Sequence, residues 1–157
     1  MEKAFSSPYV LKQRLGHDLD AREIAEYDPE AFEAIVAKPP ALHRFPRANA
    51  KRIQEMCQVL VSRYDGQAEN VWAGVQSGAE LVRRVGVLPG FGKQKSQIFT
   101  ALLAKQFGIK PDGWREATGV YGEEGSLRSV ADITDEGSLA KVREFKQAQK
   151  AAAKSGD

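Results

Sequence analysis

The sequence is poor in the residues that hold most metals and all disulfides. Its 157 residues include one cysteine, Cys57, and two histidines, His17 and His43. A single cysteine excludes an intramolecular disulfide, a four-cysteine zinc site and a cysteine-ligated iron–sulfur cluster within one chain. The two histidines stand too far apart in sequence to indicate a metal site. We therefore expect chemistry that runs without a bound metal centre.

Long apolar runs are absent as well. No stretch approaches the roughly 18 apolar residues of a membrane-spanning helix, and the N-terminal MEKAFSSPYV has no apolar core of the signal-peptide type. We expect a cytoplasmic protein with no membrane partner. Hydrophobic residues make up 42% and charged residues 28%, which is typical of a globular chain. Its length leaves room for one compact domain, or for two small lobes that share a core.

Acidic residues are missing from the middle of the chain. Residues 81–110 carry six Lys or Arg and no acid, for a charge of +6, and residues 41–63 carry +4. The remainder therefore carries −8, much of it in residues 18–33, where seven acids accompany one arginine. A polyanion is the natural partner of such a basic middle, although a run of like charges is also common on a solvated helix face.

The apolar spacing predicts helices throughout and no strand, so the expected fold is all-α. Asp20 and Asp28 are predicted N-caps, the second followed by Pro29 at the first helical position. From about Arg47 to Tyr64 the apolar residues recur with the spacing of an amphipathic helix. Further helices are expected to start after Ser77 or Gly78 and run to about residue 87, to run from about 93 to 107, and to start at Ser138, with one helical turn within residues 109–126.

The stretch Leu88, Pro89, Gly90, Phe91, Gly92 lies between two of these helices and is long enough only for a tight turn. Proline fixes φ, and the two glycines accept positive φ or let another backbone come close. We expect Leu88 and Phe91 on the buried side of the turn. The glycine amides and the first N–H groups of the next helix would form an anion pocket on the exposed side.

A plain helix–helix turn, with glycine only for its geometry, is the alternative. Four basic residues flank the turn, namely Arg83 and Arg84 before it and Lys93 and Lys95 after it. A merely structural turn has no need of them, so their presence favours anion binding.

LPGFG with a helix on each side resembles the helix-hairpin-helix element that binds DNA phosphates without regard to sequence. NAKRIQEMCQVLVSRYDG followed by ELVRRVGVLPGFGKQKSQIFTALLAKQFG is similar in order and spacing to the core of endonuclease III, over roughly residues 44–112. The whole chain resembles small actinobacterial proteins of the helix-hairpin-helix glycosylase superfamily, through MEKAF, YGEEGS, SVAD and KVREFK.

The resemblance implies one helix-hairpin-helix glycosylase-like domain over residues 1–157, with the hairpin element at about 78–108 and a frayed tail at about 152–157. It also implies that part of the N-terminal helical region is lacking, because a helix precedes MEKAF in the superfamily. Members bind double-stranded DNA, flip a base out of the duplex and cleave its bond to the sugar. No cofactor is implied, apart from a possible monovalent cation at the hairpin.

In the superfamily, enzymes that also cut the DNA strand carry a nucleophilic lysine two residues after the second hairpin glycine. Gln94 stands at that position here, and its neutral amide cannot form a Schiff base. The implied enzyme is therefore monofunctional. Lys93 and Lys95 point about 100° to either side of Gln94 on a helix, so we expect them to contact phosphates.

The superfamily's aspartate, which supports hydrolysis, corresponds to Asp112 in GIKPDGW, 18 residues after Gln94. The alternative for Asp112 is a turn role, because Pro-Asp-Gly is a common turn. Asp132, in SVADITD, is a second candidate.

Aromatic residues divide between the candidate site and the core. Trp114 and Tyr121 follow Asp112 and could stack on a flipped base, although packing is favoured for Trp114. Trp72, Phe99 and Phe107 stand among apolar positions and are expected in the core, and Cys57 is expected to be a buried small hydrophobe.

The leading hypothesis is a monomeric, monofunctional DNA glycosylase with Asp112 as catalytic residue. The expected DNA contacts are Arg83, Arg84, Leu88, Pro89, Gly90, Phe91, Gly92, Lys93, Gln94 and Lys95. One alternative is a non-catalytic helix-hairpin-helix DNA-binding module. Another is a helical adaptor whose basic middle meets an acidic protein.

Overall fold

The structure is a computed structural model that describes residues 2–155, with side chains from residue 6 to residue 153. Within these residues it contains eight α-helices, three short 3-10 helices (η) and no strand, so the all-α prediction is confirmed. The chain forms two compact units. Unit 1 takes the described residues up to Val71 together with Leu88–Gly90, and unit 2 takes Trp72–Val87 and the described residues from Phe91 onward.

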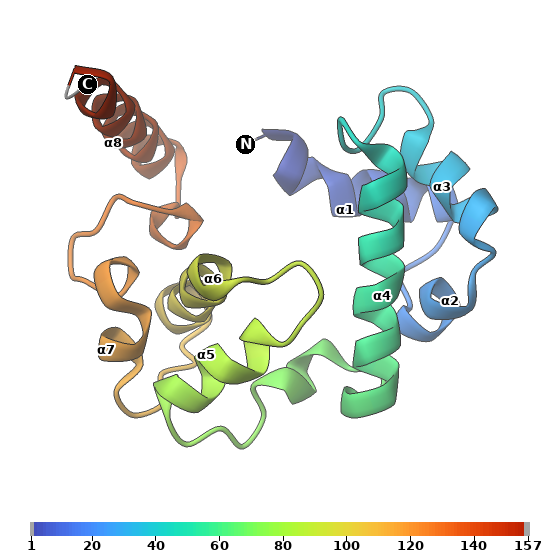
Figure 1. Ribbon diagram of the computed structural model, residues 1–157, viewed down its shortest axis with the longest axis horizontal. Helices are drawn as coiled ribbons and strands as arrows, with labels where there is room; N and C mark the ends of the chain where they lie inside the picture. The colour runs from blue at the N-terminus through green and yellow to red at the C-terminus, as the bar shows by residue number, and fades with distance from the viewer. Residues whose placement is uncertain (1, 156–157) are drawn as a thin grey trace. The chain divides into compact units, whose positions relative to one another are not determined.

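Unit 1 is built on one long helix. Its elements are α1 (Glu2–Leu15), α2 (Ala21–Glu26), α3 (Pro29–Ala37), α4 (Pro46–Tyr64) and η1 (Ala68–Val71), coloured blue to green in Figure 1. Helix α4 packs against α2, α3 and η1, and α1 packs against α3. The core between them contains Leu11, Ile24, Phe32, Val36, Ala50 and Cys57.

Two aspartate N-caps set the starts of α2 and α3 in unit 1, as predicted. The Asp20 carboxylate accepts the N–H groups of Arg22 and Glu23 at 2.7 and 3.0 Å. The Asp28 carboxylate accepts the N–H of Ala31 at 2.8 Å. These are N-cap bonds, which satisfy amides that have no partner inside the helix. Both predicted N-caps are therefore confirmed, and α4 begins at Pro46, one residue before its expected start.

Unit 2 is arranged around a central helix. Its elements are α5 (Gly78–Gly86), α6 (Lys93–Gln106), α7 (Trp114–Thr118), η2 (Gly119–Tyr121), η3 (Val130–Asp132) and α8 (Glu136–Ser155). Helix α6 packs against α5, α7, η2 and η3, and α8 packs against η3. Helix α8 starts two residues before the predicted Ser138 because the Asp135 carboxylate accepts the Ser138 N–H at 2.7 Å, as an N-cap does.

The aromatic residues of unit 2 differ from expectation at one position. Phe107 is 67% exposed, so its prediction as a core residue is wrong. Helix α6 ends at Gln106 and Phe107 is its C-cap, after which Gly108 turns the chain with φ +73°. Phe99 is half-buried beside Phe91 and Trp72, with ring centroids 5.5 and 6.4 Å away.

Trp114 and Cys57 are each 8% exposed, which confirms the packing roles predicted for both. Among the described residues, no helix has the length and apolar character required to cross a membrane.

Burial raises the pKa of the Cys57 thiol to about 11 from its ordinary value of 9.0. Because the pKa is raised, the reactive thiolate at pH 8 is about a hundredfold scarcer than in the unfolded chain. We therefore expect a thiol reagent to label the native protein at least about a hundredfold more slowly than the protein in denaturant. Equal labelling rates in the two states would contradict the burial of Cys57, and Cys57→Ala supplies the unlabelled control.

Candidate nucleic-acid interface

The hairpin begins with a well-capped helix. The Ser77 side chain accepts the N–H of Glu80 at 3.2 Å and so caps α5, which ends at Gly86. Arg83 and Arg84 lie in the last turn of α5, where positive charge interacts favourably with the helix dipole. The Arg84 guanidinium pairs with the Glu80 carboxylate at 2.7 Å and donates to the Ala73 carbonyl at 3.2 Å, whereas the Arg83 side chain is exposed.

The two glycines of the turn have different roles. Gly90 has φ +84°, a conformation that favours glycine, and a Cβ at this position would collide with the Arg52 side chain of α4. Gly92 has φ −103° and ψ −179°, which any residue adopts, and a Cβ there would meet nothing within 4 Å. Backbone geometry therefore requires glycine at residue 90, while at residue 92 its absent side chain leaves open space.

Gly92 is the N-cap of α6 and provides no side-chain cap. The first N–H groups of an α-helix have no partner within the helix, and together they carry its positive end. The first turn of α6 contains Lys93, Gln94 and Lys95, all exposed, and no acid. The buried Ser96 hydroxyl donates to the Lys93 carbonyl at 2.9 Å and so stabilises this turn. These features are those of helix N-termini that bind anions.

Gln94 and Tyr121 form a pair that the sequence did not indicate. The Gln94 Nε2 donates to the Tyr121 hydroxyl at 2.7 Å, across 27 positions of sequence. Because the tyrosine oxygen accepts this bond, its own O–H remains able to donate to another acceptor. Nearby, the Gln97 Nε2 donates to the Ala117 carbonyl at 3.2 Å. Tyr121 therefore lies beside the first turn of α6, at the hairpin.

Asp112 is held at the end of α5 that lies opposite the hairpin turn. Its N–H donates to the Gln76 carbonyl at 3.0 Å, and its carbonyl accepts the N–H of Gly78 at 2.7 Å. These bonds hold the Asp112 backbone at the start of α5, whereas Gln94 follows the turn beyond the end of α5. Helix α5 has nine residues, which corresponds to about 13 Å. The Asp112 side chain is exposed, and its catalytic role stays a prediction.

The side chain of Asp132 is buried among hydrogen-bond donors. Its carboxylate is 3% exposed and accepts from the Lys105 Nζ at 2.6 Å and from the N–H groups of Arg128 and Ser129 at 3.0 Å. The Ser126 hydroxyl donates to it at 3.3 Å. These donors occupy the oxygens that a second catalytic aspartate would need.

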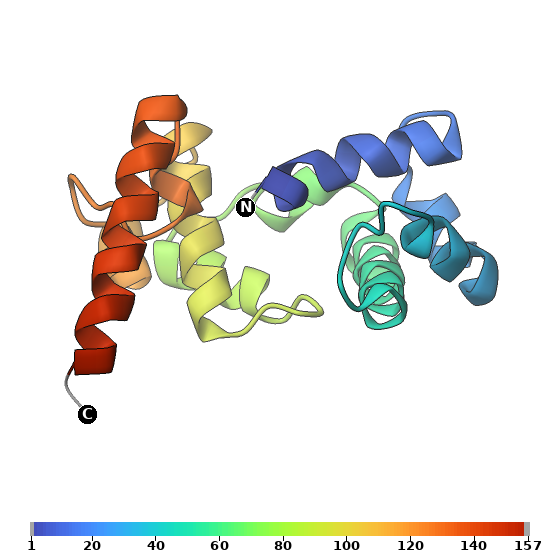
Figure 2. The ribbon, with the colours of Figure 1, turned by 90° about the horizontal axis from the view of Figure 1, so that it is seen from above.

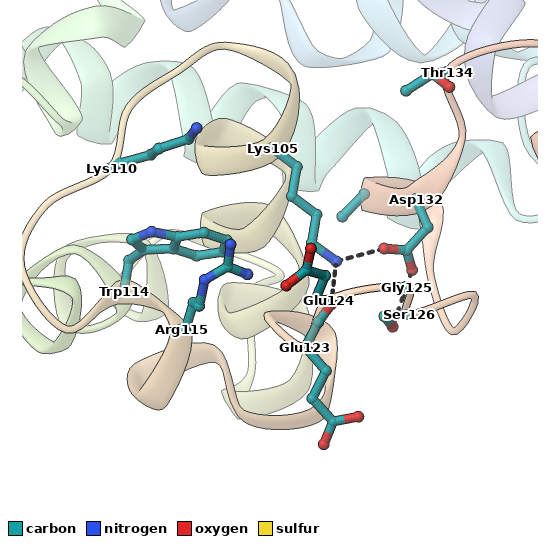
Figure 3. A pocket seen from close by; sticks show the side chains of 11 residues that line it. Lys105, Lys110, Trp114, Arg115, Glu123, Glu124, Gly125, Ser126, Asp132 and Thr134 are labelled. Atoms are coloured by element: carbon teal, nitrogen blue, oxygen red, sulfur yellow. Dashed lines mark hydrogen bonds and ion pairs between the residues drawn. The ribbon is translucent and has the colours of Figure 1, made fainter.

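The ion pair of Lys105 and Asp132 lines a pocket of about 330 Å³ in unit 2, between the end of α6, α7 and the segment after η2 (Figure 3). The Arg115 guanidinium lies over the ring of Trp114 at 4.7 Å from its centroid. The other pocket residues include Lys110, Glu123, Glu124 and Ser126.

A second basic surface lies in unit 1, where the sequence indicated only an excess of charge. Phe45 is 56% exposed, and the Arg44 guanidinium lies over its ring at 4.7 Å from the centroid. Arg47 and Lys51 adjoin them around a shallow hollow of about 530 Å³. We call Arg44, Phe45, Arg47 and Lys51 the Phe45 patch. The basic run of residues 41–63 was the signal for it, but an exposed phenylalanine was not predictable from apolar spacing.

In the part of the chain that the structure describes, no three His, Cys, Asp or Glu side chains gather as metal ligands would. Comparison of the chain with protein-family models, with curated proteins and with solved structures finds no match.

The different environments of Asp112 and Asp132 predict different effects of substitution on the free energy of unfolding. Asp132→Ala would leave Lys105 without its buried partner and two amides without an acceptor, so we expect a loss of about 3 kcal/mol or more in the free energy of unfolding. Asp112→Ala removes an exposed carboxylate and leaves the backbone bonds intact, so we expect a change within about 0.5 kcal/mol. Urea unfolding of both variants measures the difference, and equal losses would contradict the structural role of Asp132.

Proposed function

We propose that the chain binds the backbone of double-stranded DNA, without regard to base sequence, through the hairpin of α5, Leu88–Gly92 and α6. The observation that carries this proposal is the open first turn of α6. It combines an N-cap without a side chain at Gly92, two exposed lysines and the absence of any acid. Backbone amides at a helix N-terminus bind phosphate through hydrogen bonds and the helix dipole together.

Three groups can contribute to such a contact. The amides after Gly92 contact one phosphate, and Lys93 and Lys95 add charge on either side of it. Tyr121, held by Gln94, can donate its O–H to a neighbouring phosphate oxygen. None of these groups reads a base edge, which is why the proposed binding is independent of sequence. The resemblance of LPGFG to the helix-hairpin-helix element supports the same partner.

The Phe45 patch offers a second group of cations that could contact DNA phosphates. An exposed aromatic ring next to arginine and lysine is suited to stack on an unpaired or flipped nucleobase while the cations contact phosphates.

The hairpin contact can be tested with one charge reversal and a matched control. Lys93→Glu puts negative charge at the first turn of α6, whereas Lys110→Glu makes the same change in an exposed residue after the opposite end of α6. We expect Lys93→Glu to weaken binding to a 30-base-pair duplex about tenfold or more, as the loss of a charge-assisted contact implies. The slope of log affinity against log salt should also fall by about 1.

Lys110→Glu should change affinity much less, because it alters net charge and not the hairpin. Fluorescence anisotropy between 50 and 200 mM salt measures both quantities. Binding by the wild-type protein that does not depend on salt, or equal effects of the two reversals, would contradict the proposed hairpin contact.

A second candidate function is excision of a damaged base by a monofunctional glycosylase. It is supported by the resemblance and by the exposed carboxylate of Asp112, which could stabilise the positive charge that develops on the sugar. Gln94 cannot form a covalent intermediate with the sugar, so the DNA strand would stay intact after base release.

Duplexes that contain uracil, hypoxanthine or an alkylated base test this activity directly. We expect an abasic site that hot alkali cleaves, and no strand cut before alkali is added. Asp112→Asn should abolish release, while Glu116→Gln, at an exposed acid of α7, should not. If no base is released from the whole panel while DNA is still bound, the chain is the non-catalytic binding module.

A further inference from the structure

Helix α8 has a half that packs and a half that is exposed. In its first half Val142 is fully buried, and the Phe145 ring lies under the Arg128 guanidinium at 5.1 Å. From residue 146 to residue 153 every side chain is exposed. Figures 1 and 2 both show the last turns of α8 lying away from α6 and α7.

A basic stripe of exposed side chains runs along α8 from its packed half into its exposed half. At about 100° per residue, Arg143, Lys146 and Lys150 lie within roughly 60° of one another around the helix axis, and they span about 10 Å along it. The single acid between residues 139 and 153 is Glu144, about 130° from the middle of this stripe. Lys141 lies on the opposite side of the helix, about 180° away.

The composition of the exposed half narrows the choice of partner. Residues 146–153 are Lys, Gln and Ala only, so this half presents no large apolar side chain. A membrane-binding helix needs such side chains for insertion, and protein interfaces concentrate their binding energy in them. A partner recognised by charge alone is a polyanion, and duplex DNA presents one negative charge per about 1.7 Å of its axis. Ala, Lys and Gln also favour helix, which holds the stripe in register before binding.

We propose that Arg143, Lys146 and Lys150 form a second contact to the DNA backbone, separate in sequence from the hairpin. This proposal rests on the proposed DNA binding and extends it: α8 would add phosphate contacts and lengthen the bound stretch of duplex. Such contacts add affinity and salt dependence and no base preference.

The test uses the full chain and two charge-reversal variants on the same helix. Lys146→Glu changes the stripe, and Lys141→Glu makes an identical change of charge on the opposite side. Both side chains are exposed, so circular dichroism should show equal helicity in the two variants. With a 30-base-pair duplex we expect Lys146→Glu to weaken binding roughly tenfold and to lower the salt slope by about 1, and Lys141→Glu to stay within about twofold of the wild type.

The double variant Lys146→Glu with Lys150→Glu should lower the slope by about 2. Equal effects of Lys146→Glu and Lys141→Glu would overturn the stripe in favour of a general effect of net charge. If neither weakens binding while Lys93→Glu does, the α8 contact is overturned and the hairpin contact stands. Wild-type protein without salt-dependent DNA binding would overturn both proposals.

Discussion

Unit 2 depends on the close packing of its other elements around α6. The buried side of this helix carries small residues, including Ser96, Thr100, Ala101 and Ala104, and these let neighbouring backbones approach closely. The elements packed against it come from both sides in sequence, α5 before it and α7, η2 and η3 after it. The candidate functional residues of unit 2 are therefore positioned largely by where their elements contact α6.

The two ends of α6 have opposite electrostatic environments. At the N-terminal end nothing acidic neutralises the helix dipole within the first turn, and the adjoining N-cap has no side chain. At the C-terminal end Lys105 is held in an ion pair with the buried Asp132. The first arrangement leaves the positive end of the helix without an acidic neighbour in its first turn, and the second uses charge to hold η3 against the helix. This difference is why the proposed DNA contact lies at the hairpin and why Asp132 is assigned to stability.

Local chemistry made much of the helical architecture predictable. An N-cap aspartate such as Asp20 or Asp28 acts over three residues, and a proline or glycine acts at its own position, so both are readable without knowing the rest of the chain. Apolar spacing gave a wrong prediction at Phe107, because the prediction of burial assumed that α6 continues through this residue. The helix ended one residue earlier, and the ring became exposed.

The sequence by itself determined the helical class, most helix starts, the glycine turn with its lysines, and the replacement of a nucleophile by Gln94. These depend on residue identity or on contacts within a few positions. Only the tertiary structure decided that Tyr121 meets Gln94, that Asp112 is anchored at the start of α5, and that Asp132 is enclosed by donors. The contacts of Tyr121 and Asp112, and the ion pair of Asp132 with Lys105, depend on how separate elements pack, because partners 27 or more residues apart leave no periodic signal in the sequence. The other donors to Asp132 are local, from Ser126, Arg128 and Ser129.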